Sequence, residues 1–595
     1  DLSGGAHGTT GIGGTWSGVT SVTGSAASDA INGQSQTYTL TGANAGTNGT
    51  VAWTSFERIA DSGVGTIGAA NQSWALTGHN QGTVTALSGS FSGIGNLSDT
   101  GSGTFLMHSG VDGSLSGNLA AGTNGTLDYA GYTTPVNVNL SGAGTTGVGG
   151  SVSGVGAISA NSDLGVSGTS GSSLSVATSG TGVTTTLGSL AVGSNLTIHA
   201  SGAILQTGDG ITVGGTTSID SSGGAVALTN SGNDFVGAVT VAGQGIALVD
   251  KNNLAVASVT DSANGAVSLI AGGTLSLPTA GINAGTGDLT LASNGGALAT
   301  VGTLSGGNVS LAGYSGLTLG GPVAATGTLA LSSSQGAINQ TAGTIAAGML
   351  TGSSAGSAIL LQANLVGTLG AFTTGGDFTF NNAQSLTVNN ALSVNGGAGN
   401  LTLTTTGASS DLTLASNLTG NTVILGAGRN INQTGGGITA TRLTGNSTGS
   451  TTLTGANLIG TLGDFSAAGF NLTNAQSLTV SGAVEGGAST TLTTTAGDLA
   501  INGALSGTTT TLISAGAITE GAGGNITANL LTGHSVGNAT LDGNNHINIL
   551  GSFSADFSLT NGQTLTVEGP LDGGPSVALT TTAGDLIING AVSGV

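Results

Sequence analysis

The sequence contains no cysteine, only five prolines and only four basic residues among its 595 positions. The missing cysteines exclude disulfide bonds and thiolate metal sites. The scarcity of proline is compatible with many central strands, because proline cannot donate to a sheet ladder. No run of 18 apolar residues occurs, so we expect no helix that inserts into a membrane. The chain opens without a basic stretch followed by an apolar one, so we expect any export signal to lie outside it.

Charge is also scarce, and it is almost all of one sign. Charged residues make up 5% of the chain, and the four basic ones oppose 25 acidic ones, which gives a net charge of −21. Ordinary globular proteins carry about a quarter charged residues. A chain this acidic repels phosphate backbones and anionic lipid surfaces, so we expect no nucleic-acid partner.

Glycine and short alternating apolar segments take the place of the missing residue types. The chain has 115 glycines, yet 37% of its residues are hydrophobic. The hydrophobic residues alternate with hydroxyl residues in triplets such as Leu196-Thr197-Ile198 and Leu478-Thr479-Val480. Alternation with period two predicts half-buried strands. This amount of patterned apolar surface argues against a disordered chain.

Three copies of one long unit occupy the C-terminal part of the chain, at spacings of 87 to 93 residues. Such internal repeats predict a fold that grows by stacking. The shared positions, in chain order, are Leu350-Thr351-Gly352, Leu443-Thr444-Gly445 and Leu531-Thr532-Gly533; Phe372, Phe465 and Phe553; Leu386, Leu478 and Leu565; and Asp411, Asp498 and Asp585.

A shorter period marks the N-terminal part. Trp16, Trp53 and Phe91 recur at 37 and 38 residues and are expected to share one structural phase. If one coil takes roughly 18 to 25 residues, the short period predicts about two coils and the long one about four. We therefore divide the chain into a region of ~37-residue repeats (1–148), a glycine-rich β-helix region (149–338) and a region of three ~88-residue repeats (339–595), the last incomplete.

These features predict an all-β fold, a right-handed parallel β-helix of roughly 30 coils that forms one continuous rod. In a coil each strand pairs with its equivalent one turn along, so identical side chains stack. A charged residue at such a position would meet a like charge about 4.8 Å away, which explains why charge is rare. At that rise, 30 coils would extend about 140 Å.

Several strings resemble the repeat regions of filamentous-haemagglutinin-like giant exoproteins and autotransporter passengers of proteobacteria. They are Ser231-Gly232-Asn233-Asp234-Phe235-Val236-Gly237-Ala238-Val239, Ile459-Gly460-Thr461-Leu462-Gly463-Asp464-Phe465, Gly516-Ala517-Ile518-Thr519-Glu520 and the segment 126–140. The resemblance implies an extracellular position at the bacterial cell surface, an outer-membrane export partner, and a receptor or glycan on a host or neighbouring cell.

Parallel β-helices also include polysaccharide-cleaving enzymes, which need clustered acids in one groove. The candidate acids are Glu57 and Asp61 beside Arg58, Glu568 with Asp572, and Asp250 beside Lys251. Each is better explained as a solvated corner. The six histidines are scattered, and the acids that open strands at Asp411, Asp498 and Asp585 are single residues rather than a calcium array. We therefore expect no catalytic residue, no metal site and no cofactor.

The sequence thus predicts a structural protein rather than an enzyme: the stalk of a bacterial surface adhesin, which holds a binding tip away from the cell. The alternative is a self-associating subunit of an extracellular filament or surface layer. A weaker alternative is a polysaccharide-active β-helix enzyme.

Overall fold

The computed structural model describes residues 1–2, 7–8, 15–108 and 114–594. The chain divides into two compact units, Asp1–Gly295 and Gly296–Val595. These two units are defined by their internal contacts. The three predicted regions, 1–148, 149–338 and 339–595, are defined by the length of the sequence repeat, and the division into units does not test them.

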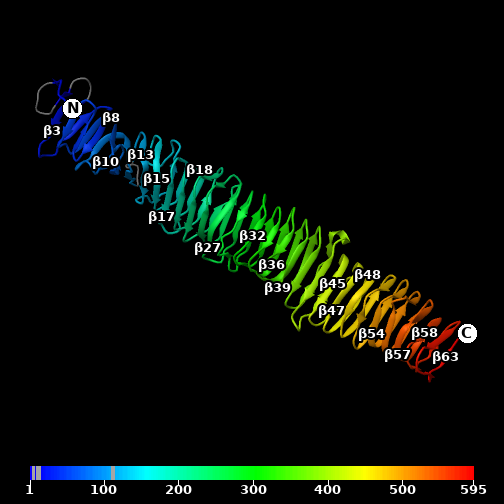
Figure 1. The fold of residues 1–595 in the computed structure, drawn as a ribbon. Helices are drawn as coiled ribbons and strands as arrows, with labels where there is room; N and C mark the ends of the chain where they lie inside the picture. Colours follow the sequence, from blue (N-terminus) through cyan, green and yellow to red (C-terminus); the bar gives the residue numbers. More distant parts are fainter. Residues whose placement is uncertain (3–6, 9–14, 109–113, 595) are drawn as a thin grey trace. The chain divides into compact units, whose positions relative to one another are not determined.

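Each unit is built from β-strands that wind in successive turns, and strands of one turn pair in parallel with those of the next (Figure 1). The first unit contains β1 (His7–Gly8), β2 (Thr15–Trp16), β3 (Ser21–Thr23), β4 (Ala30–Gly33), β5 (Thr37–Gly42), β6 (Ala45–Thr47), β7 (Ala52–Thr54), β8 (Arg58–Ala69), β9 (Ser73–Gly78), β10 (Gln81–Val84), β11 (Phe91–Asp99), β12 (Thr104–Leu106), β13 (Leu119–Tyr129), β14 (Val136–Asn139), β15 (Val152–Ala160), β16 (Leu164–Ser170), β17 (Leu174–Thr178), β18 (Thr185–Val192), β19 (Leu196–Ala200), β20 (Ile204–Gln206), β21 (Ile211–Val213), β22 (Thr217–Ser221), β23 (Val226–Leu228), β24 (Asp234–Phe235), β25 (Val239–Gly243), β26 (Ile246–Asp250), β27 (Leu254–Asp261), β28 (Val267–Ala271), β29 (Leu275–Ser276), β30 (Ile282–Asn283) and β31 (Leu289–Ser293).

The second unit continues the same pattern, with one short 3-10 helix, η1 (Asn395–Gly397). Its strands are β32 (Leu298–Thr300), β33 (Leu304–Gly306), β34 (Val309–Gly313), β35 (Leu317–Leu319), β36 (Val323–Ser333), β37 (Ile338–Gln340), β38 (Ile345–Ser354), β39 (Ala358–Thr374), β40 (Phe378–Asn382), β41 (Leu386–Val388), β42 (Leu392–Val394), β43 (Leu401–Thr405), β44 (Leu412–Leu414), β45 (Leu418–Ala427), β46 (Ile431–Gln433), β47 (Ile438–Ser447), β48 (Ser450–Ser466), β49 (Gly469–Asn474), β50 (Leu478–Val480), β51 (Val484–Glu485), β52 (Ser489–Thr494), β53 (Leu499–Ile501), β54 (Ala504–Ser514), β55 (Ile518–Glu520), β56 (Asn525–Ser535), β57 (Ala539–Ser554), β58 (Phe557–Asn561), β59 (Leu565–Val567), β60 (Leu571–Asp572), β61 (Val577–Thr581), β62 (Leu586–Ile588) and β63 (Val592–Ser593).

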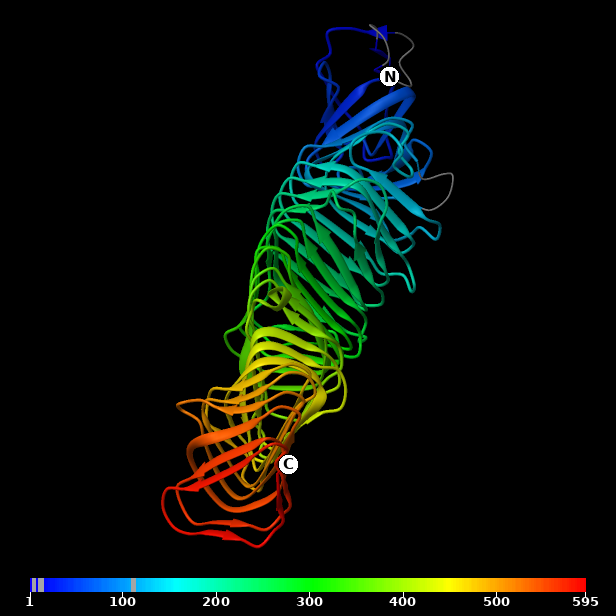
Figure 2. The same cartoon turned by 90° about the vertical axis from the view of Figure 1, so that its right-hand side faces the viewer.

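One turn of the second unit has three strand segments, and therefore three faces. The strands β32, β33 and β34 follow one another, and the next strand, β35, pairs with β32 through Leu298 and Leu317. Longer strands such as β36 bend through a corner and serve two faces, because β33 pairs with one end of β36 and β34 with the other. Figure 2 shows these turns, coloured from green to red, following one another around their core.

The fold is thus an all-β parallel solenoid, as predicted, but it has about 23 turns rather than 30. The difference arises because the turns are longer than the sequence estimate assumed. The longest ones lie near the N-terminus, where Ile67 pairs with Leu97 of the next turn and Leu127 pairs with Ile158. Antiparallel hairpins lengthen turns in that part of the chain, β5 with β6 and β9 with β10.

The long sequence repeat does not end on the face where it began. Ala358 lies on the face that follows Leu350 along the chain. From Ala358 the parallel pairings pass through Phe378, Leu401 and Val423 to Leu443, which is four turns later. One repeat therefore equals four turns plus one face. The same advance separates the next two copies, because Thr451 follows Leu443 by one face and connects to Leu531 through Phe470, Thr490 and Thr510.

The short period advances in the same way, so the expectation of two whole coils is wrong. Trp53 in β7 lies one face before Ile59 in β8, and Ile59 pairs directly with Phe91 in the next turn. The interval from Trp53 to Phe91 is therefore one turn plus one face. Equivalent residues of successive repeats therefore lie on different faces. Each strand pairs with the strands of the adjacent turns and not with its equivalent in the next repeat.

The core consists of the inward residues of every strand, and a recurrent pair of residues explains one of the shared motifs. Phe465 is 2% exposed and pairs in register with Gly445 of the preceding turn. A Cβ atom on Gly445 would lie 2.9 Å from the Phe465 ring and 2.1 Å from the carbonyl oxygen of Leu425. The other copies repeat the arrangement with Gly352 below Phe372 and Gly533 below Phe553. The glycine of each Leu-Thr-Gly motif thus makes room for a phenylalanine one turn later.

Deleting residues 432–518 removes one repeat, four turns and one face, and joins Ile431 to Thr519. We expect the variant to keep its fold, because every downstream strand then stacks on the equivalent of its native neighbour. Deleting residues 432–510 removes four whole turns but stacks non-equivalent strands, and should lower the melting temperature measured by circular dichroism. Equal melting of the two variants would contradict the account of the repeat.

The substitution Gly445→Ala should destabilise the second unit by about 2 kcal/mol, because the added methyl group overpacks the Phe465 ring and a neighbouring carbonyl. Gly171→Ala is the matched control, since nothing lies within 4 Å of a Cβ atom at Gly171. Thermal melting of both variants tests this, and a Gly445 variant that melts like the Gly171 variant would rule the contact out.

Candidate functional site

The residues predicted from the repeats occupy the core and the corners. Leu386, Leu478, Leu565, Phe372, Phe465 and Phe553 are each at most 3% exposed. Trp53 and Phe91 are fully buried, whereas Trp16 is only partly buried. The phenylalanines each pack against a second phenylalanine of the following strand, with ring centroids 4.5 to 4.7 Å apart. These positions stabilise the turns and carry no chemistry of their own.

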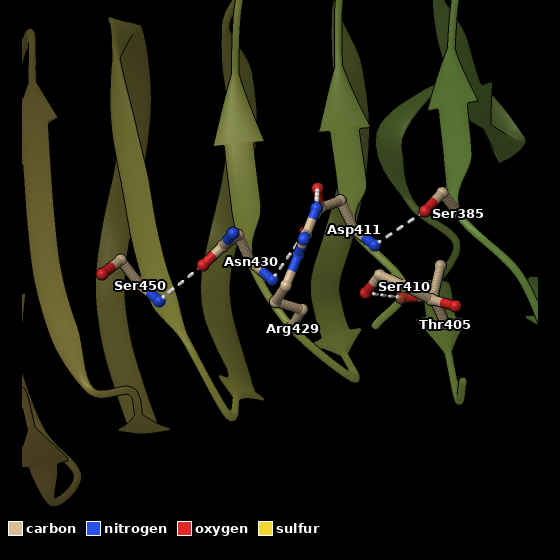
Figure 3. A network of polar contacts seen from close by, with 7 residues as sticks. All are labelled: Ser385, Thr405, Ser410, Asp411, Arg429, Asn430 and Ser450. Carbon is tan, nitrogen blue, oxygen red and sulfur yellow. Dashed lines mark hydrogen bonds and ion pairs between the residues drawn. The ribbon is translucent and has the colours of Figure 1, made fainter. Parts of the chain in front are cut away.

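Asp411 precedes a strand and belongs to a series of hydrogen bonds that climbs from turn to turn (Figure 3). Its own amide donates to Ser385 Oγ of the preceding turn at 3.1 Å. Its carboxylate accepts the amide of Asn430 in the next turn at 3.0 Å, and Asn430 Oδ1 accepts the amide of Ser450 at 2.9 Å. Arg429 pairs with the carboxylate from outside, and this hydrogen-bonded ion pair holds the pKa of Asp411 below its usual range.

The same hydrogen bond recurs at many corners. Asp498 accepts the amide of Ala517 at 2.8 Å, and the amide of Asp585 donates to Thr564 Oγ1 at 3.2 Å. Side-chain oxygens that accept the amide of the following turn also belong to Asn96, Asn118, Asp163, Asn195, Asn253, Asn308, Asp377, Asn417 and Asp464. These side chains accept hydrogen bonds from backbone amides at the corners, where no backbone carbonyl is available as an acceptor.

The acids singled out near the N-terminus also have structural partners. Asp61 is 8% exposed and accepts the amides of Ser35, Gln36 and Gly63 and the hydroxyl of Tyr38. Glu57 accepts the amide of Asp29 at 2.8 Å. Asp61 is thus a buried acceptor rather than a solvated corner residue, and the sequence pattern did not indicate this.

Asp99 repeats the role of Asp61 in the next copy of the short repeat. Its carboxylate accepts the amides of Asn71, Gln72 and Gly101 and the indole N–H of Trp74. Burial acts to raise the pKa of Asp99, but the four donors outweigh burial and lower it. Asp250 is also buried, and there burial raises the pKa. Lys251 forms its ion pair with Asp234, at 2.9 Å, rather than with Asp250.

A large concavity lies in the second unit, on the outer surface of one face over successive turns. It has a volume of about 1360 Å³. Its floor is a column of outward residues, one from each turn: Glu485, Ser506, Thr527 and His546. The glycine-rich corner 521–524 and the corner from Asp542 to Asn544 also line the cavity.

Amide side chains are held in place along the rim of this cavity. Gln563 Nε2 donates to Asn548 Oδ1 at 2.7 Å, and Asn548 Nδ2 donates to Asn529 Oδ1 at 3.1 Å. Asp542 accepts a hydrogen bond from Ser558, and its side chain is exposed. The rim therefore presents preorganised amides beside an exposed carboxylate. Sequence reasoning missed Asp542, Glu485 and the amides, because each is an isolated polar residue in a polar chain.

The internal repeats provide a direct comparison for this cavity. Where the third copy has Asp542 and His546, the second has Thr454 and Leu458, and the first has Leu361 and Leu365. The aliphatic residues at these positions are exposed, Leu361 by 53% and Leu458 by 41%. Asn544 and Asn548 likewise replace Ala456 and Gly460 of the second copy. The third copy keeps the backbone frame and replaces small or apolar surface residues with polar ones.

Glu520 lies beneath the cavity and replaces a glutamine of the other copies. Gln433 Nε2 donates to Asn457 Oδ1 at 2.9 Å and to the Gly436 carbonyl at 3.2 Å, and its Oε1 accepts two hydrogen bonds. Glu520 Oε2 accepts hydrogen bonds from the Gly543 amide and from Asn545 Nδ2. Among the described residues, Glu520 Oε1 is buried without a partner. Burial raises the pKa of Glu520, because the charged form lacks the solvation that it would have in water.

Comparison with known proteins adds one family. A model described as repeats of unknown function (DUF5649) matches residues 171–242. No curated protein and no solved structure matches the chain. The matched segment runs from β17 to β25, where Leu174, Leu196, Thr217 and Val239 stack in successive turns. The matched segment therefore spans several successive turns of the solenoid.

Two further findings concern the described part of the chain. No helix in it is long and apolar enough to cross a membrane. No group of three or more histidine, aspartate or glutamate side chains in it is arranged to hold a metal ion.

Replacing Glu520 with glutamine should stabilise the second unit by about 1 kcal/mol at neutral pH, since the new amide can donate to Asn545 Oδ1 as Gln433 does to Asn457. A carboxyl whose folded pKa is raised stabilises the folded state only while protonated. Stability of the parent should therefore fall as the pH rises through the raised pKa, and the variant should lose this dependence.

Thermal melting at a series of pH values from 4 upwards measures the effect. Glu485→Gln is the control, because that side chain is exposed in the same cavity and its loss should leave melting unchanged. A Glu520→Gln variant with the parent's melting temperature at every pH would show that the buried carboxyl carries no penalty.

Proposed function

We propose that this chain is part of the extracellular stalk of a bacterial surface adhesin, and that it holds a binding tip away from the cell. The resemblance to filamentous-haemagglutinin-like exoproteins motivates the location and an outer-membrane export partner. A receptor or glycan on a host or neighbouring cell would be the target of the tip. The function of this segment would be reach and stiffness.

The observation that carries the proposal is the hydrogen bonding between successive turns within each unit. Successive turns are joined by parallel ladders on their faces and by side-chain hydrogen bonds at their corners, such as that from the Asn430 amide to Asp411. A structure joined at faces and corners alike resists bending, because any bend must lengthen hydrogen bonds on one side. At about 21 residues a turn, the second unit makes about 14 turns, which at about 4.8 Å per turn rise about 70 Å.

A second candidate is a self-associating subunit of an extracellular filament or surface layer. Exposed aliphatic side chains on the second unit favour it, notably Leu361, Leu365 and Leu458, each more than 40% exposed. Apolar residues on outward faces can pack against another copy of the chain.

Single-molecule stretching of the chain, held at its two ends, tests the stalk. We expect a tether that keeps its length at low force and then lengthens in steps as turns unravel. A chain that extends smoothly like a flexible polymer would contradict the proposal.

Sedimentation tests the second candidate by comparing the parent with a variant in which Leu361, Leu365 and Leu458 are replaced by threonine. Self-association requires that the parent form assemblies and that the variant fail to form them.

A further inference from the structure

The cavity lined by residues between Glu485 and Gln563, from the second and third repeats, has the properties of a binding site rather than of an ordinary corner. Four of its polar residues, Asp542, Asn544, His546 and Asn548, occur in the third copy alone, although the three copies share the same backbone pattern. The stability of the solenoid does not require them, because the second copy has Thr454 and Leu458 at the positions of Asp542 and His546. Residues that depart from a repeat at the surface, together and around one concavity, indicate a role outside folding.

The charges of the cavity restrict the ligand. Glu485 and Asp542 are exposed carboxylates that line it, and Glu520 lies beneath them. In the described part of the chain, its lining includes no lysine or arginine. The whole protein carries a net charge of −21. This field repels phosphates, uronates and other anions and attracts amines.

The hydrogen-bonding groups restrict the ligand further. Amides from Asn529, Asn544, Asn548 and Gln563, together with the hydroxyls of Ser506 and Thr527, offer donors and acceptors along several turns. Such groups suit a ligand with many hydroxyls. The volume of about 1360 Å³ exceeds the range of about 300–1,000 Å³ common for small-molecule sites, so the cavity suits an extended oligomer.

We infer that this cavity binds an oligosaccharide with free amino groups, whose ammonium groups meet Glu485 and Asp542 and whose hydroxyls meet the row of amides. Binding is a further activity, independent of whether the chain acts as a stalk. It requires no cleavage of the ligand. Because the contacts are charge-assisted and open to solvent, the affinity falls as the salt concentration rises.

Isothermal titration calorimetry of the full chain with four probes tests the ligand class. A glucosamine hexamer with free amines should bind at least tenfold more tightly than its N-acetylated form, which keeps every hydroxyl but has no charge. The affinity for the glucosamine hexamer should exceed that for spermine, which has charge but no hydroxyls, by the same factor. Hexagalacturonate should not bind. Absence of glucosamine-hexamer binding, or equal binding of either of the first two comparison probes, would overturn the inference.

A triple variant locates the site. Glu485→Ser, Asp542→Thr and His546→Leu replace the polar groups with residues that other copies of the repeat carry at equivalent positions, so the variant is expected to fold, which melting verifies. It should lose at least tenfold in affinity for the hexamer. The control is Asp572→Ser, the position one repeat after Glu485 and outside the cavity. Parent-like affinity in the folded triple variant, or an equal loss in the control, would overturn the location.

Discussion

The structure depends on one constraint: every turn must satisfy the backbone of the turn before it. Parallel ladders do this along the faces, but at the corners the chain bends and amide groups are left without a carbonyl acceptor. Side chains of asparagine, aspartate and serine supply the missing acceptors from one turn to the next, as Asn195 does for Thr216 and Asp377 for Asn400. The unusual composition follows from this. Amides and hydroxyls can stack at about 4.8 Å without repulsion, whereas rows of like charges cannot.

The repeats, which advance by whole turns plus one face, follow the same rule. Each strand stacks only on the strands one turn before and one turn after it, so duplication in the sequence preserves the fold wherever these local neighbours are preserved. It does not need to return to the same face. One consequence is that the copies of a repeat present their outward residues in different directions. A change in one copy, such as the replacement of Leu361 and Thr454 by Asp542, then alters one site and leaves the rest of that face unchanged.

The strands and much of the core could be predicted because their signal is local. Alternation marks Leu478 and Val480 as inward, and the repeats place Phe372, Phe465 and Phe553 in equivalent surroundings. The number of turns could not be predicted, because hairpins such as β9 with β10 lengthen a turn without changing its pattern. The faces of the repeats were also inaccessible, since the length of a repeat does not reveal where corners fall.

The cavity could not be predicted from the sequence for another reason. Glu485 lies more than 50 residues before Asp542 and His546, and only the pairings of Glu485 with Ser506, Ser506 with Thr527 and Thr527 with His546 bring these turns together on one face. Comparing the copies for departures from their shared pattern could have identified them.

The central claim is that strands meet their neighbours one turn away and not their equivalents in the next repeat. The absence of cysteine from the chain allows a direct measurement of this by disulfide formation between engineered pairs. Thr479 and Ala500 are paired in adjacent turns, so cysteines there should lie within the Cα separation of about 4.4–6.8 Å that a disulfide requires. Thr387 and Thr479 occupy equivalent positions of successive repeats, four turns and one face apart. The account predicts rapid oxidation of the first pair within single chains and none of the second. Oxidation of the second pair with failure of the first would contradict it.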